Sequence, residues 1–199
     1  MAIRKFSTAS VSAGSNKSTK LWDQETFQSG MFAIATILLT SDQSVVTFSG
    51  ISSTYTHLQL RYMAKCTQTG TGYSVMQIRF NSDSGTNYSG HELVGDGSTA
   101  TSGGAGTDAA ASQSQIQIRW PQTSAQFSVG VIDLLDYANT SKNTTLKALA
   151  GFDNNGSGNA MFTSGAWYNT AAITTISIYP KHNSIISGSH FALYGIKSA

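Results

Sequence analysis

The chain has 199 residues, with 12 Lys and Arg against 10 Asp and Glu, and only 11% of its residues are charged, where soluble domains average about 25%. Hydroxyl side chains fill much of the remainder, with 29 Ser and 23 Thr, and the 40% of hydrophobic residues suffice for one sizeable core. A net charge of +2 that is scattered along the chain provides no dense basic face for phosphates. We therefore expect one globular domain that binds no nucleic acid.

Residues 1–26 carry Ser, Ala, Lys and Arg without apolar periodicity, so alone they cannot bury enough surface to hold a fold. They are either a flexible tail or an assembly arm whose aromatic side chains dock on an adjacent subunit. The candidate anchors of such an arm are Phe6, Trp22 and Phe27. No apolar run of roughly 7 to 15 residues follows the early basic residues, so we expect no signal peptide.

Alternating apolar and polar residues predict β-strands along the rest of the chain. In residues 114–120, Ile116, Ile118 and Trp120 share one face, which we expect to be buried, and Pro121 ends the strand. The expected strands, each bounded by Gly, Asn, Ser or Pro, are 31–39, 45–48, 57–64, 76–80, 114–120, 127–134, 145–150, 173–179 and 190–196. The first is strongly apolar but far shorter than the ~20 residues of a membrane helix, so we expect no membrane segment.

Three stretches depart from simple alternation. In 127–134 the apolar positions change phase after Val131, which predicts an extra residue in the ladder, that is, a β-bulge. Only Asp133–Thr140 is able to wind into a short turn. Residues 95–113 and 153–159 are rich in Gly, Ser and Asn and are expected to be loops. The first loop is either a surface excursion or an exposed recognition loop or arm that reaches a neighbour.

Many short strands between Gly, Ser and Asn turns predict an all-β fold. The expected architecture is an antiparallel two-sheet sandwich of jelly-roll type, and a β-barrel is the alternative. We divide the chain into an extended N-terminal arm, residues 1–26, and a β-sandwich domain, residues 27–199. The single cysteine forms no intrachain disulfide, so stability must come from packing and from association with other subunits.

Candidate catalytic residues are scarce. The four histidines, His57, His91, His182 and His190, are too far apart for a local metal motif, and we expect ordinary hydrogen-bonding roles for them. Cys66 has no sequence-local base and is expected to be an inert thiol. The chain contains no GxSxG elbow, no P-loop and no GxGxxG between a strand and a helix. The sequence therefore predicts no enzyme, no metal and no cofactor.

Some acidic residues lie in patterns that resemble sites. Asp153 begins a calcium-like loop, but the twelfth position is Ser164 instead of glutamate, so a surface turn is favoured. The cluster at Asp83 has the same interpretation. Asp133 and Asp136 are the only close carboxylate pair on an expected strand, and we expect them to cap a turn near Tyr137 and not to act as a glycosidase pair.

Certain phrases resemble a family of bacteriophage jelly-roll virion structural proteins. These phrases are FSGISSTYTHLQLR at 48–61, IRFNSDSGTNYSGHELVGDGS at 78–98 and SGSHFALYGIKSA at 187–199, with AGFDNNGSG and WYNTAAITTISI between them. The resemblance runs in order from Phe27 to Ala199. Cys66 and Met63 stand where polar or Arg residues are expected, which bears on packing only. The resemblance implies a jelly-roll β-sandwich that serves in the virion, on its head or its tail, without enzymatic activity.

Two classes of function follow. The leading hypothesis is a capsid decoration or cement protein that binds the major capsid protein or other virion proteins, as a homo-oligomer, with a trimer favoured. Such a protein is made in the host cytoplasm and located in the virion. The alternative is a tail fibre or adhesin whose loop 95–113 and exposed aromatics, such as Tyr73, Tyr88 or Trp167, bind a host glycan. For Trp167 a core position is the competing interpretation.

Overall fold

The computed structural model describes residues 30–70, 72–105, 116–121 and 126–197, so the expected anchors Phe6, Trp22 and Phe27 lie outside the described residues. The described part of Met31–Ala199, one compact unit, contains β-strands and no helix. The strands are β1 (Met31–Leu38), β2 (Val46–Phe48), β3 (His57–Ala64), β4 (Tyr73–Phe80), β5 (Tyr88–Gly95), β6 (Ala100–Ala105), β7 (Ile116–Pro121), β8 (Ser128–Leu135), β9 (Thr144–Asp153), β10 (Gly158–Trp167), β11 (Ile176–Pro180) and β12 (His190–Ile196).

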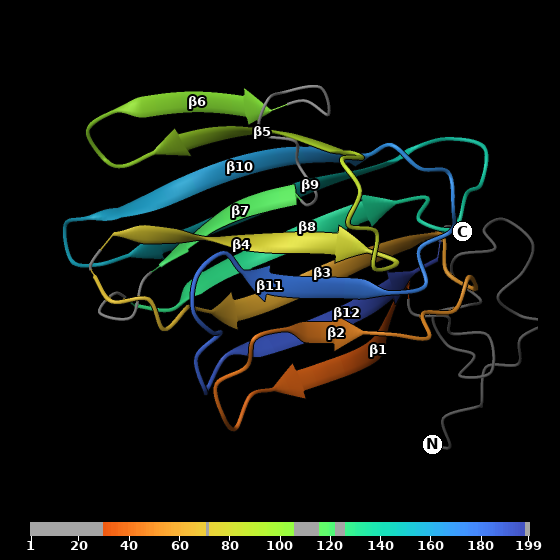
Figure 1. Ribbon diagram of the computed structural model, residues 1–199, viewed down its shortest axis with the longest axis horizontal. Coiled ribbons are helices and arrows are strands. Elements are labelled where there is room, and N and C mark those ends of the chain that lie inside the picture. Colours follow the sequence, from red (N-terminus) through yellow and green to blue (C-terminus); the bar gives the residue numbers. More distant parts are fainter. Residues whose placement is uncertain (1–29, 71, 106–115, 122–125, 198–199) are drawn as a thin grey trace, which may run out of the picture. The chain divides into compact units, whose positions relative to one another are not determined.

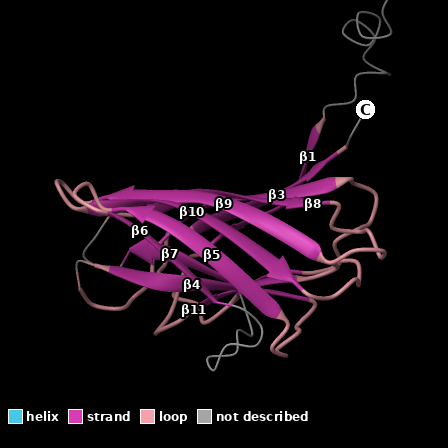
Figure 2. Cartoon of the chain, turned by 90° about the horizontal axis from the view of Figure 1, so that it is seen from above, coloured by secondary structure: helices cyan, strands magenta, loops and turns pink. Residues whose placement is uncertain are grey.

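These strands form two antiparallel sheets that pack face to face, as Figure 2 shows in a view along the layers. The large sheet has eight strands in the order β1-β12-β3-β8-β9-β10-β5-β6, and the small sheet has four in the order β2-β11-β4-β7 (Figure 1). The prediction of an all-β, two-sheet antiparallel sandwich is therefore confirmed.

The pairing order also confirms the jelly-roll type. The pairs β1–β12, β2–β11, β3–β8 and β4–β7 are all antiparallel and fall alternately in the large and the small sheet. This is the order produced when one long hairpin is rolled across two layers, which is the double Greek key of a jelly roll. Two further hairpins, β5–β6 and β9–β10, are inserted in the chain and extend the large sheet beyond β8.

Each of the expected strands is present, but β5, β6 and β10 were not predicted. Strand β6 lies inside the expected loop 95–113, so that prediction is wrong for residues 100–105, and residues 106–113 are outside the described part. The sequence ATSGGA has no apolar alternation, and it forms a strand because β5 provides the backbone hydrogen-bond partners along Gly90–Gly95. In β5 and β10, glycines interrupt the apolar alternation, so the sequence pattern did not predict these two strands.

The predicted bulge in 127–134 is wrong. The ladders of β8 with β3 and with β9 run without a register shift. Ser128, Gly130, Ile132 and Leu134 point inward, while Val129 points into solvent. The change of phase arises because β8 carries apolar residues on both of its faces. The register shift of the large sheet lies in β1, between Ala33 and Ala35.

The core lies between the sheets and is rich in aromatic side chains. Trp120 of β7 is 0% exposed, as predicted, while the side chains of Ile116 and Ile118 lie outside the described part. On the large sheet, the rings of Trp167 and Tyr88 stack with centroids 6.3 Å apart, and Phe80 of β4 meets Trp167 at 5.7 Å. One continuous buried cluster thus supports both sheets.

Candidate interaction surface

His57 and Cys66, two of the candidate catalytic residues, make structural hydrogen bonds. Nδ1 of His57 accepts a hydrogen bond from the backbone N–H of Asp136 at 3.0 Å, which confirms its expected hydrogen-bonding role. The thiol of Cys66 is buried and donates to the carbonyl of Pro121 at 3.6 Å. Within the described residues, no group of three or more His, Cys, Asp and Glu side chains is placed to hold a metal ion, and no helix is long and apolar enough to cross a membrane.

The two carboxylates of the suspected glycosidase pair serve separate contacts. Asp133 accepts a hydrogen bond from Gln59 at 2.8 Å and lies 3.6 Å from the ammonium of Lys147. Asp136 pairs with Lys142, and the hydrogen bond from this ammonium is the main cause of a lowered pKa of Asp136. Its carbonyl closes a turn with the N–H of Asn139 at 2.9 Å, so the predicted turn near Tyr137 is confirmed for Asp136. Asp133 lies within β8 and does not cap this turn, so that part of the prediction is wrong.

Asp83 lies in the connection between β4 and β5 and joins the two sheets. Its carboxylate accepts hydrogen bonds from the indole of Trp167 at 2.7 Å, the amide of Asn87 at 3.0 Å and the N–H of Gly85 at 2.8 Å. Partial burial alone raises the pKa of Asp83, but these hydrogen bonds outweigh it and hold the pKa below its usual value. The carboxylate therefore organises a corner of the sandwich, as the turn interpretation predicted.

The calcium-like segment that begins at Asp153 is a hairpin turn between β9 and β10. The N–H of Asn154 bonds to the carbonyl of Ser157 at 2.7 Å, and Asn155 and Gly156 occupy the left-handed region at φ of 51° and 95°. An Asn-Gly pair with positive φ at both positions is the preferred two-residue turn of a β-hairpin. The predicted surface turn is confirmed at 154–157, but it is shorter than the expected loop 153–159, because Asp153 belongs to β9 and residues 158–159 belong to β10.

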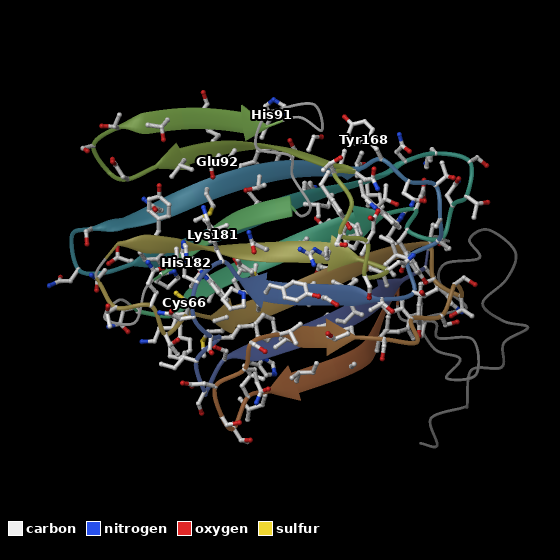
Figure 3. The ribbon with its side chains drawn as sticks, in the orientation of Figure 1. Cys66, His91, Glu92, Tyr168, Lys181 and His182 are labelled. Carbon is white, nitrogen blue, oxygen red and sulfur yellow. The ribbon has the colours of Figure 1, made fainter. Side chains whose placement is uncertain are left out.

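Two of the three aromatics proposed for glycan binding are in the core. Tyr88 is 0% exposed and Trp167 is 1% exposed, so neither is able to present its ring to a sugar, and the core interpretation of Trp167 is correct. Tyr73 is exposed and lines a cavity of about 210 Å³ together with Gln68, Ser74, Lys181 and His182. Figure 3 shows Lys181 and His182 side by side at the end of the small sheet where β11 ends and β4 begins.

The outer face of the large sheet carries a cluster of exposed apolar side chains, which we call the apolar face. Five of its members are between 42% and 61% exposed, and Val131 is half-buried among them. The members are Met63 on β3, Val129 and Val131 on β8, Leu149 on β9, Phe162 on β10 and Leu93 on β5.

The register aligns these residues into continuous rows. Val131 lies opposite Leu149, Leu149 opposite Phe162, and Phe162 opposite Leu93, so one apolar row crosses four adjacent strands. Directly opposed residues in an antiparallel pair are about 4.5–5.5 Å apart at Cβ and stand on the same face. The neighbouring row also lacks charge and consists of Met63, Val129, Gly151, Ala160 and Gly95.

A polar row borders the apolar face on its other side. It runs through Gln59, Asp133, Lys147, Ser164 and His91. The guanidinium of Arg61 is held away from the apolar face, 5.4 Å above the ring of Tyr194 on β12. Arg61 and Lys147 balance Asp133 and Asp153, so the outward positions of β3, β8 and β9 carry no net formal charge.

The outer face of the small sheet has a different character. Thr47 of β2 contacts Ser177 of β11 through hydroxyl oxygens 3.3 Å apart, and Ser177 lies opposite Arg79 of β4. The guanidinium of Arg79 covers the ring of Tyr179 at 5.1 Å. The outer side of this sheet is therefore polar, with Thr47 exposed, Arg79 half-buried and Ser177 buried between them, whereas the large sheet presents uncovered aliphatic and aromatic side chains.

The chain is thus a jelly-roll β-sandwich whose large sheet is extended by two inserted hairpins and carries an apolar outer surface. Comparisons with protein-family models, with curated proteins and with solved structures return no match to this chain.

The apolar face was not predicted, although the sequence contains a signal for it. Leu93-Val94, Val131-Ile132 and Met161-Phe162 are neighbouring pairs of large apolar residues within strands. Because successive side chains of a strand point to opposite faces, each pair places one apolar side chain in the core and one outside. These pairs indicate strands with two apolar faces, but only the register shows that the outer members lie together.

Proposed function

We propose that the protein is a non-enzymatic structural component of a bacteriophage virion, and that it functions by packing against other proteins of the particle. The observation that carries this proposal is the apolar face. Monomeric soluble proteins rarely expose a contiguous apolar patch beyond a few hundred Å², and larger patches mark sites of interaction. The jelly-roll fold and the phrases that resemble virion proteins support the particle as the place where this interaction occurs.

The proposed partners are the major capsid protein or other virion proteins, together with copies of the chain itself. Residues 1–26 act in this proposal as the assembly arm, with Phe6, Trp22 and Phe27 as its anchors. Burying one aromatic side chain contributes roughly 1.5–3 kcal/mol, so a few anchors offset part of the entropy lost when the arm is ordered. The protein then acts as a decoration or cement protein attached to the particle lattice.

The test is quantitative mass spectrometry of purified particles of the phage that encodes the chain. A decoration protein is expected in hundreds of copies per particle, and a fibre in tens or fewer. Absence from purified particles would overturn the structural role, and a low copy number would favour a tail location.

The role of the arm is tested by replacing Phe6, Trp22 and Phe27 together with Ser. We expect a folded protein whose incorporation into particles falls sharply. A matched variant that replaces Ser7, Ser10 and Ser12 with Ala, in the same segment, should be incorporated like the natural chain. Equal incorporation of both variants would show that attachment does not use the aromatic side chains.

A second candidate function, glycan binding by a fibre or adhesin, is favoured by one observation. Tyr73 offers an exposed ring beside Lys181, His182 and the cavity that they line, and aromatic rings with neighbouring polar groups bind sugars by stacking and hydrogen bonding. Binding of a host polysaccharide that is lost in Tyr73→Ala and retained in Tyr168→Ala, a control at another exposed tyrosine, would establish this function.

A further inference from the structure

We propose that two copies of this chain pack against each other through the apolar face, about a two-fold axis that passes close to Leu149 and Phe162. The inference rests on the proposed assembly function, from which it takes that the apolar face is covered, and it identifies a second copy of the chain as the partner. Leu149 and Phe162 lie opposite each other at the centre of the apolar row, on β9 and β10.

The size of the large sheet suits such an interface. With the axis between β9 and β10, six strands, β3 to β6 in the sheet order, overlap between the copies. At a spacing of ~4.8 Å and about eight residues per strand at ~3.4 Å per residue, they give a surface of about 24 Å by about 27 Å. This area of about 650 Å² per copy lies at the lower end of the roughly 600–1,000 Å² that each partner buries in a stable interface, with the apolar face at its centre.

The charge distribution favours an identical partner. A two-fold axis brings each surface against its own copy, so a strongly charged face would repel itself. Here Arg61 and Lys147 balance Asp133 and Asp153, and Asp133 is already neutralised by Lys147 within the chain. A strongly acidic or basic partner gains no attraction from such a surface, whereas a second copy brings a neutral apolar surface of the same extent.

The geometry of packed sheets provides the fit. Two sheets pack face to face about 10 Å apart with their strands within about 30° of each other, and the side chains of the facing rows interdigitate. Around an axis near Leu149 and Phe162, the aliphatic and aromatic rows of one copy meet the same rows of the other. The flanking small residues Gly151, Ala160 and Gly95 leave room for the larger side chains of the facing copy.

The arrangement closes on two chains, so it differs from the trimer expected from the sequence. Analytical ultracentrifugation of the purified full-length chain should give about twice the chain mass of 21.0 kDa. A single-chain mass at a concentration of about 100 µM, or a three-chain mass, would overturn the inference.

Charge substitutions at Leu149 test whether the two-fold axis passes close to this residue. Leu149→Glu and Leu149→Lys each bring like charges together in a desolvated interface, so each variant should be monomeric, with a dissociation constant raised by at least about a hundredfold. An equimolar mixture of the two variants should again give the two-chain mass, because opposite charges then face each other. Val45→Glu, at an exposed apolar residue beside β2, should remain a dimer.

Retention of the dimer by both Leu149 variants, or its loss in Val45→Glu, would show that another surface joins the copies. Circular dichroism of each variant controls for folding, and recovery in the mixture cannot come from unfolded chains. Failure of this inference is distinguishable from failure of the proposed function. A monomeric protein abundant in particles overturns only the pairing, and a dimer absent from particles overturns only the virion role.

Discussion

The outer surfaces of the two sheets differ although both sheets cover the same core. On its outer side the small sheet carries the exposed hydroxyl of Thr47 and the half-buried guanidinium of Arg79, and Ser177 between them is only 4% exposed. A polar outer side is expected for an antiparallel sheet with one solvated face. The large sheet shows Leu149, Phe162 and their neighbours, which repeat the apolar character of a core face. The large sheet therefore has two sets of apolar residues, because the inner set packs in the core and the outer set remains exposed.

The location of the apolar rows in the topology supports this separation. Three of the four strands crossed by the central row, β9, β10 and β5, belong to the inserted hairpins and not to the rolled eight-strand framework. The framework strands β1, β12, β2 and β11 form the opposite part of the molecule (Figure 1). The insertions therefore add an exposed apolar surface to a fold that is complete in its pairing without them.

The largest expected effect is on the shared core beneath both faces. Trp120→Ala should lower the free energy of unfolding by about 3–5 kcal/mol, because a large buried side chain is lost and a cavity remains. Chemical denaturation should show one cooperative transition for both sheets. Trp120→Phe should cost less, since the indole N–H of Trp120 has no hydrogen-bond partner in the described structure. A loss below about 1 kcal/mol for Trp120→Ala would contradict the common core.

The next largest effect is the difference in stability loss between substitutions on the inner and the outer side of β8. A Cβ on Gly130 would lie 2.5 Å from the ring of Tyr62, which is buried and stacks on the ring of Phe191. Gly130→Ala should therefore cost about 1–3 kcal/mol in urea unfolding. Val129→Ala, one residue away on the apolar face, should change the stability of the monomer by about 0.5 kcal/mol or less. Equal losses would mean that β8 does not divide an inner from an outer side.

A pH-dependent effect tests the corner where the two sheets meet. Since the pKa of Asp83 is lower in the folded chain, its contribution to stability is complete above the unfolded value of about 3.9 and is lost as pH falls through the folded value. Asp83→Asn should be less stable than the natural chain at pH 6, and the difference should narrow toward pH 2. Other acidic groups are common to both proteins and cancel in the difference. A difference in stability between the two proteins that does not change with pH would show that the ionised carboxylate of Asp83 does not stabilise this corner.

The smallest effect is expected on the polar outer face. Arg79→Ala removes the guanidinium from the ring of Tyr179 and should cost about 0.5–1 kcal/mol in thermal unfolding. Leu149→Ala should leave the unfolding of the monomer within about 0.5 kcal/mol and weaken only the association of chains. The opposite result, a destabilised monomer in Leu149→Ala and an unaffected one in Arg79→Ala, would reverse the assignment of the two faces.

Local patterns were sufficient to predict most strands and the class of the fold. In 57–64 the alternation marks the buried side without knowledge of the neighbours, and Trp120 was placed in the core on the same basis. The pattern failed where a strand has no apolar alternation, as in β6, and where both of its faces are apolar, as in β8. In the first case backbone pairing alone forms the strand, and in the second the phase change imitates a bulge.

The sequence by itself determined an all-β chain of short strands with low charge, because the direction of a side chain from an extended backbone depends only on its position along the strand. The tertiary structure alone decided that Val131, Leu149, Phe162 and Leu93 form one row, since they come from four strands spread over 70 residues and meet only through the register of three ladders. It also decided that Tyr88 and Trp167 are buried, because the partners that enclose them lie on other strands. An apolar surface of this kind is a property of strand order, which no local pattern contains.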